Sequence, residues 1–119
     1  MKLLTKDQHD KLLKNGTDTA QRLAEGMDTN DHPPVVKLFT PDAACTWLLS
    51  ELDPEDPDIA FGLCDLGFGT PELGSVRLSE LASIRGRLGL PVERDLHFTA
   101  DKPLSAYADD ARMAGCIRA

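Results

Sequence analysis

The side chains best suited to acid–base chemistry in this chain are its carboxylates and its histidines. The histidines are well separated along the sequence: His9, His32 and His97. His97 and Asp95 fall on the same side of a strand-like segment, which suits an acid–base pair. Hydrolysis by paired carboxylates requires two acids to meet, and the candidates are Glu51, Asp65 and Glu72. A hydrolytic enzyme with a carboxylate and histidine site is therefore one hypothesis, with no catalytic residue assigned.

Metal and cofactor binding have no matching pattern in the sequence. The chain has three widely spaced cysteines without a Cys-x-x-Cys pair: Cys45, Cys64 and Cys116. The glycines near residue 67 do not continue into a dinucleotide fingerprint, because Glu72 stands where the third glycine belongs. The acidic stretch 53–58 lacks the mid-loop glycine of a calcium loop. We therefore expect no metal site and no cofactor, and the unpaired cysteines favour a cytoplasmic location.

Negative charge is concentrated in the middle of the chain. The 119 residues include 20 acidic and 13 basic side chains, for a net charge of −7, and residues 38–76 contain no lysine or arginine. Direct nucleic-acid binding is not expected, because affinity for phosphates depends on clustered bases. An acidic surface instead attracts a protein with a basic surface. The residues predicted to form this partner-binding surface are Glu51, Asp53, Glu55, Asp56, Asp58, Asp65 and Glu72.

The first part of the chain is predicted to be helical. Thr5 and Gln8 have the spacing of a capping box, and leucines follow at helical intervals. Glycine weakens a helix interior, so Gly16 divides the prediction into two pieces, 6–14 and 18–26. A proline pair then ends a linker that leads into the rest of the chain.

Residues 45–66 are predicted to form the central hairpin of a sheet. The expected elements are a strand over 45–52, a turn over 53–57 and a strand over 58–66. In the predicted register Leu52 faces Asp58. One face then carries the bulky apolar pairs, which are Trp47 with Leu63 and Leu49 with Phe61. The alternative is a helix that begins at Thr40, where a capping oxygen precedes a proline, and we favour the hairpin.

The remaining elements complete an α+β fold with a mainly antiparallel sheet and N-terminal, short mid-chain and C-terminal helices. They are strands at 35–39, 72–78 and 92–99, a helix at 79–85 capped by Ser79, and a helix from Pro103 to about Ala114 that stops at Gly115. We expect a single domain, 1–119, with a helical segment and linker at 1–34 and a sheet-based core at 35–119. No apolar run is long enough for a membrane span, and we expect a monomer or weak dimer.

Several ordered blocks together resemble a bacterial domain family of unknown function that is common on plasmids, phages and integrative elements. The blocks are VKLFTPD (36–42), TWLLSELDP (46–54), FGLCDLG (61–67), ELGSVRLSEL (72–81) and RGRLGLPVERDLHF (85–98). The resemblance implies a small cytosolic protein of a mobile element but no activity. The main hypothesis is an acidic interaction or accessory protein. The alternative is an anti-defence inhibitor, of CRISPR or restriction systems, with a DNA-mimicking acidic surface.

Overall fold

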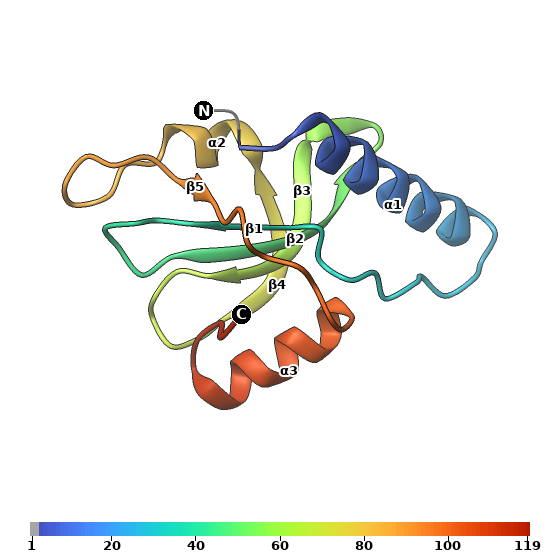
Figure 1. Cartoon of the computed structure of the whole chain (residues 1–119). Helices are drawn as coiled ribbons and strands as arrows, with labels where there is room; N and C mark the ends of the chain where they lie inside the picture. The colour runs from blue at the N-terminus through green and yellow to red at the C-terminus, as the bar shows by residue number, and fades with distance from the viewer. Residues whose placement is uncertain (1–2) are drawn as a thin grey trace.

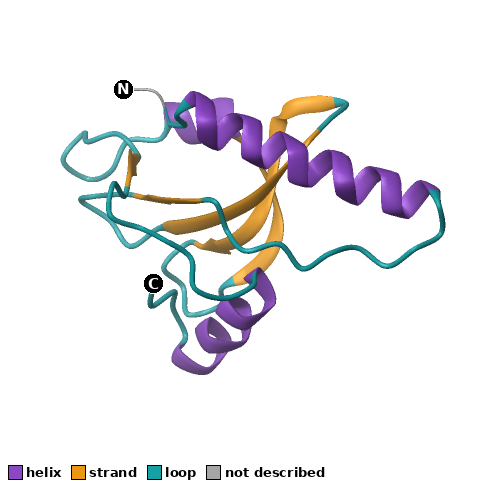
Figure 2. Ribbon diagram, turned by 45° about the vertical axis from the view of Figure 1, so that its right-hand side comes forward, coloured by secondary structure: helices purple, strands orange, loops and turns teal. Residues whose placement is uncertain are grey.

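A five-stranded antiparallel sheet forms the centre of the computed structural model, which describes residues 3–119. The strand order is β4-β3-β2-β1-β5, and Figures 1 and 2 show α1 and α2 on one side of the sheet and α3 on the other. The elements are α1 (Lys6–Ala24), β1 (Val36–Phe39), β2 (Thr46–Asp53), β3 (Asp56–Asp65), β4 (Glu72–Arg77), α2 (Leu78–Ser83), β5 (Glu93–Arg94) and α3 (Leu104–Ala114). The predicted α+β class is confirmed.

Each face of the sheet has its own apolar core. On one face, α1 and α2 contribute Leu12 and Leu81 to a cluster that includes Trp47, Leu49 and Leu52. On the other face, α3 covers the side chains of Leu48 and Leu63 with Leu104, Tyr107, Ala108 and Ala111. Because burial of apolar surface drives folding, these two clusters fix the three-layer arrangement. None of the helices formed by residues 3–119 is both long and apolar enough to cross a membrane.

The β2–β3 hairpin forms, but its predicted register is wrong. Trp47 faces Cys64 rather than Leu63. Beyond it, Leu49 faces Gly62 while Glu51 faces Phe61, so Ser50 is an extra residue, as in a β-bulge. A side chain at position 62 would not fit, because its Cβ would lie 2.0 Å from the carbonyl oxygen of Leu48. The different pairing moves Leu63 and Phe61 away from the face that holds Trp47.

The turn of this hairpin is also tighter than predicted. The loop contains two residues, Pro54 and Glu55, and pairing resumes with Asp53 opposite Asp56. The Asp53 carboxylate accepts the backbone N–H of Glu55 at 2.9 Å. This side-chain acceptor stabilises the turn locally, which is why the strands extend closer to it than the proline positions indicated.

α1 is one continuous helix, so the predicted break at Gly16 is wrong. The capping box of Thr5 and Gln8 begins it as expected. Gly16 is where the helix passes closest to β2: a Cβ there would lie 1.7 Å from the carbonyl oxygen of Leu52. The contact lies beyond the end of β1, which pairs only with residues 46–49 of β2. A long-range packing requirement therefore outweighs the low helix propensity of glycine, a cost of about 1 kcal/mol.

The strand predicted for 92–99 is only two residues long. β5 pairs with β1, and the last contact is the N–H of Asp95 with the carbonyl oxygen of Lys37 at 3.0 Å. The Asp95 carboxylate then accepts the N–H of His97 at 2.8 Å, which turns the chain away from the sheet. The C-terminal helix ends as predicted, with Gly115 in the left-handed conformation at a φ of 78°.

Substitution of Gly16 by alanine tests the α1–β2 contact. We expect Gly16→Ala to lower the free energy of unfolding by about 1–3 kcal/mol, because the new methyl group displaces the helix from the strand. Alanine would raise stability at an unconstrained helical position. Urea unfolding followed by fluorescence of Trp47, which is the only tryptophan and is 2% exposed, measures the change. Gly74→Ala is the control, since nothing lies within 4 Å of its Cβ position, and a Gly16→Ala protein as stable as this control would contradict the contact.

Candidate functional site

A shallow groove crosses the sheet between the C-terminal half of α1 and the start of α3. Two adjoining hollows form it, with volumes of about 290 and 180 Å³, and both are lined by Glu51 and Phe61. Leu23 from α1 and Leu73 from β4 border it. The apolar side chains are open to solvent, with exposed fractions of 63% for Leu23, 37% for Phe61 and 39% for Leu73. We call this feature the Glu51 groove.

The β-bulge at Ser50 determines that Glu51 lies in this groove. With regular alternation, Glu51 would share a face with Trp47 and Leu49. The extra residue reverses the alternation, so Leu52 enters the core beside Trp47 and Glu51 faces the opposite side next to Phe61. The one-residue bulge thus buries Leu52 in the core and leaves the Glu51 carboxylate at the surface of the groove.

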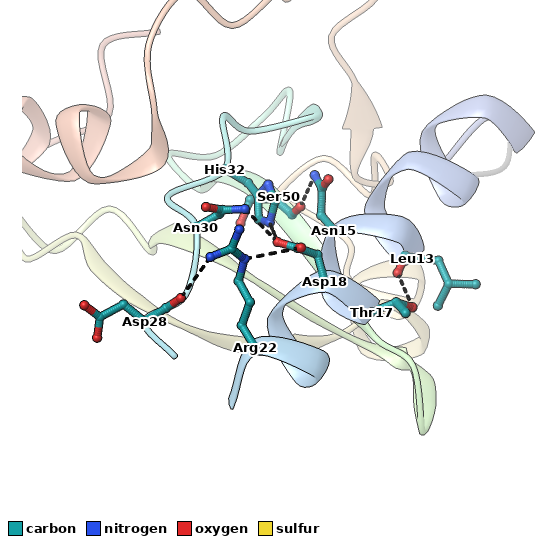
Figure 3. A network of polar contacts seen from close by, with 9 residues as sticks. All are labelled: Leu13, Asn15, Thr17, Asp18, Arg22, Asp28, Asn30, His32 and Ser50. Carbon is teal, nitrogen blue, oxygen red and sulfur yellow. Dashed lines mark hydrogen bonds and ion pairs between the residues drawn. The ribbon is translucent and has the colours of Figure 1, made fainter. Parts of the chain in front are cut away.

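A polar network joins the wall of the groove to the linker that follows α1 (Figure 3). The Asp18 carboxylate accepts a hydrogen bond from Asn30 at 2.9 Å and another from Arg22 at 3.4 Å. His32 Nε2 lies 3.2 Å from Asp18 Oδ2, an ion-pair distance, although its direction does not satisfy a hydrogen bond. The side chain of His32 is only 15% exposed. These contacts hold the linker against α1 at the edge of the groove.

Glu51 is half-buried, and its electrostatic surroundings favour the neutral carboxylic acid. Burial raises the pKa of Glu51 most, and the negative charge of Asp18 raises it further. The hydroxyl of Thr19 and the imidazole of His32 act in the opposite direction without cancelling the shift. Among residues 3–119, no lysine or arginine forms an ion pair with Glu51. The groove therefore contains a carboxylate whose negative charge is poorly compensated.

The other predicted acidic residues divide into groups with different environments. Asp53 lines the groove beside Glu51, and Glu55 is exposed in the adjoining turn. Asp56 and Asp58 lie 3.2 and 3.6 Å from the guanidinium of Arg77. Residues 38–76 contain no basic side chain, but β4 places Arg77 next to Asp56 and Asp58, so these two acids are paired within the chain.

Asp58 also holds the start of α2. Its carboxylate accepts the backbone N–H of Ser79 at 2.9 Å and the Ser79 hydroxyl at 2.7 Å. Ser79 was expected to cap its own helix, but α2 starts one residue earlier and Ser79 is a donor to β3 instead. The hydrogen bond from the Ser79 side chain lowers the pKa of Asp58 most, and the bond from the Ser79 backbone and the Arg77 side chain lower it further. This acid has a structural function.

Asp65 and Glu72 lie at the far end of the hairpin from the turn. From Glu55 to Asp65 the strand rises on the order of 30 Å. Asp65 is 3% exposed and accepts the N–H groups of Gly67 at 2.9 Å and Ile117 at 3.0 Å. Glu72 is exposed at the end of β4. Of the seven predicted surface acids, the structure therefore places Glu51 and Asp53 in the groove and Glu55 in the adjoining turn.

The residues of the hydrolase hypothesis are not gathered in one cavity. His97 and Asp95 line a separate hollow of about 320 Å³, whereas Glu51 lines the groove. No group of three or more His, Cys, Asp or Glu residues within 3–119 has an arrangement that would hold a metal ion. The cysteines are free, and burial raises the pKa of the Cys64 thiol, which disfavours a thiolate nucleophile there.

Asp18 and His32 were not recognised from the sequence as neighbours of Glu51. They meet only because the linker folds back along α1, and no local motif signals that contact. The position of the bulge is indicated by the sequence. The apolar spacing of Trp47, Leu49 and Leu52 departs from a period of two at Ser50, which is the pattern expected where one extra residue enters a strand.

Substitution of Glu51 tests its unfavourable burial. We expect Glu51→Gln to raise the free energy of unfolding at pH 7 by on the order of 0.5 kcal/mol, because it removes a half-buried charge that solvent partly screens. The folded-state pKa of Glu51 is raised, so the ionised side chain is destabilising above that pKa and has no such cost when protonated in both states. The gain should therefore disappear as the pH falls below the ordinary glutamate value of 4.5.

Urea unfolding at several pH values measures this difference, with Glu72→Gln as the matched control at an exposed strand position. A Glu51→Gln gain that is absent at pH 7, or that grows on acidification, would show that the groove does not disfavour the carboxylate.

Comparison with known proteins places the chain in a family without assigning it an activity. No curated protein and no solved structure matches it. A family described as "Protein of unknown function (DUF2958)" matches residues 3–118. The resemblance to a domain family of unknown function is confirmed at this level, whereas the association with mobile elements stays a prediction. The chain belongs to the DUF2958 family of proteins of unknown function.

Proposed function

We propose that this chain is an interaction protein whose Glu51 groove binds a positively charged, partly apolar segment of a partner protein. One observation carries the proposal. A half-buried carboxylate without an ion-pair partner among residues 3–119 lies beside exposed apolar side chains, namely Leu23, Phe61 and Leu73. A lysine or arginine from a partner would compensate this charge, and adjoining apolar side chains of the partner would cover the leucines and the phenylalanine.

The energetics favour contact at Glu51 over contact at the fully exposed acids. The attraction between two unit charges rises as the effective dielectric constant falls, from about 1 kcal/mol in bulk water at 4 Å to about 4 kcal/mol in a partly shielded site. A cation bound at Glu51 would also favour the ionised carboxylate and so offset the effect of burial, which raises the pKa of this residue. Asp53 and Glu55 contribute a longer-range attraction that speeds encounter.

The proposed binding site uses fewer acids than the surface predicted from the sequence, and these acids do not suit a DNA mimic. A mimic must present negative charges at the dense, regular spacing of DNA phosphates, about one per 1.7 Å of helix axis. Here Asp65 is buried and Asp56 and Asp58 are paired with Arg77. The remaining cluster suits a short basic segment of a protein. Within this proposal the protein acts in the cytoplasm as an accessory protein of a mobile element.

A peptide-binding experiment tests the groove. The probe is a short fluorescent peptide of alternating lysine and leucine, and the matched probe has glutamate in place of lysine. We expect the lysine peptide to bind and to shift the backbone amide NMR signals of Phe61 and Leu73. Glu51→Gln should weaken binding by about 10- to 100-fold, since a charge-assisted contact contributes about 1.5–3 kcal/mol.

Glu72→Gln is the control and should bind as tightly as the unaltered protein, because Glu72 lies outside the groove. Equal affinity for the lysine and glutamate peptides, or NMR shifts confined to residues outside the groove, would overturn the proposal.

A further inference from the structure

A second exposed feature, a turn in the segment between α2 and β5, has the opposite chemistry to the groove. The N–H of Gly89 donates to the carbonyl oxygen of Gly86 at 3.0 Å, which leaves Arg87 and Leu88 at the two corners of the turn. Leu88 is 81% exposed. The guanidinium of Arg87 is exposed and forms no hydrogen bond or ion pair with any part of the chain described, residues 3–119. We call this feature the Arg87 turn.

The Arg87 turn is held rigidly from beneath by a carboxylate. One oxygen of Asp42 accepts the N–H groups of Leu88 at 2.7 Å and Leu90 at 3.3 Å. The Asp42 carboxyl lies so close to Gly86 that a Cβ there would be 1.6 Å from Oδ1. Gly89 has a φ of 80°, which favours glycine. A turn fixed in this way loses little conformational entropy when its corner residues bind another surface.

The turn and the groove are complementary in both charge and hydrophobicity. The turn presents an unpaired cation next to an exposed leucine, and the groove presents an uncompensated carboxylate next to exposed apolar side chains. In Figures 1 and 2 the turn lies at the left of the molecule, whereas the C-terminal end of α1 lies at the right. A single copy therefore cannot satisfy its own groove with its own turn.

We propose that the Arg87 turn of one copy docks into the Glu51 groove of a second copy, so that the chain associates head to tail. The inference rests on the proposed function of the groove and names a second copy of this chain as the partner. Leu88 enters the hollow beside Leu23 and Phe61, and Arg87 pairs with Glu51. A cavity of about 150 Å³ accepts a benzene-sized apolar group, so the hollow of about 290 Å³ has room for a leucine side chain.

The net charge of −7 sets a limit on this contact. At physiological ionic strength, charges separated by more than about 8 Å are largely screened. The close pairing of Arg87 with Glu51 therefore outweighs the general repulsion between copies, but a contact of this size is weak. Because turn and groove occupy different surfaces, the contact is heterologous, and each copy added end to end leaves a free turn and a free groove for a further copy.

Analytical ultracentrifugation of two variants, each of which disables one of the two surfaces, and of their mixture tests the inference. Leu88→Asp disables the turn, and Leu23→Asp disables the groove; both positions are more than half exposed, so folding is preserved. We expect the unaltered protein at millimolar concentration to have a weight-average mass above the 13.0 kDa of the monomer. Each variant alone should remain monomeric. Their equimolar mixture should form a dimer of about twice the 13.0 kDa mass and nothing larger, because one intact turn meets one intact groove.

Leu96→Asp is the matched control, since Leu96 is 70% exposed and lines neither surface; this variant should associate like the unaltered protein. A monomeric unaltered protein, variants that associate on their own, or a mixture that stays monomeric would each overturn the inference. Binding of the lysine–leucine peptide shows whether the groove is a binding site even when the copies do not associate. If Leu88→Asp binds that peptide while no association occurs, the groove is a binding site and its partner is another protein.

Discussion

One extra residue in the β2–β3 pairing determines how the two faces of the sheet are used. Up to Leu49, alternate side chains of β2 point to the core that α1 and α2 cover. The bulge at Ser50 resets the alternation, so Leu52 continues that core and Glu51 turns to the other side. The same region receives α1, because Asn15 donates to the carbonyl oxygen of Ser50 at 3.0 Å on the edge that β1 leaves uncovered. Core, helix position and groove all depend on this irregularity.

The acidic composition of the chain does not show which acids are available to a partner, because several carboxylates accept hydrogen bonds within the chain. Asp42 supports the Arg87 turn, Asp58 holds the start of α2, and Asp65 binds two backbone N–H groups. Ionised acceptors form stronger hydrogen bonds than neutral ones, which explains why acids occupy these positions. These acids keep their negative charge, but their hydrogen bonds hold them in place within the chain, whereas Glu51 lines the groove and Glu55 is exposed in the adjoining turn.

Features determined by neighbouring residues were predictable from the sequence, and features determined by distant contacts were not. The capping box of Thr5 and the C-terminal stop at Gly115 depend on local hydrogen bonds and backbone conformation, and both are as predicted. The strand assignments at 35–39, 45–52, 58–66 and 72–78 follow from apolar patterns and are correct over most of their length, whereas the strand predicted for 92–99 is reduced to Glu93–Arg94. The continuity of α1 through Gly16 depends on Leu52, far away in the sequence. Propensity alone therefore predicted a break that tertiary packing removes.

The candidate site shows the same division. Glu51 was identified as an acid of the central ribbon, but its side of the sheet followed from a register that the bulge changes. The pairing of Asp56 with Arg77 requires β4 to lie beside β3, and the approach of His32 to Asp18 requires the linker to fold back on α1. These contacts join elements that are farther apart in the sequence than the residues of any local motif. The residue types in the sequence therefore identified the acids, but they did not show which acids lack a basic partner among the residues that the structure describes.

The two donors to Asp65 arrive at very different times during synthesis of the chain. Gly67 follows the aspartate by two residues, whereas Ile117 follows the whole sheet. Strands β1 to β4 pair with their neighbours in sequence order, so this meander can assemble as it leaves the ribosome. Until Ile117 emerges, one oxygen of Asp65 must remain hydrated, and the end of β3 stays open to water. The late hydrogen bond then closes that end and couples the C-terminal segment to a sheet formed earlier.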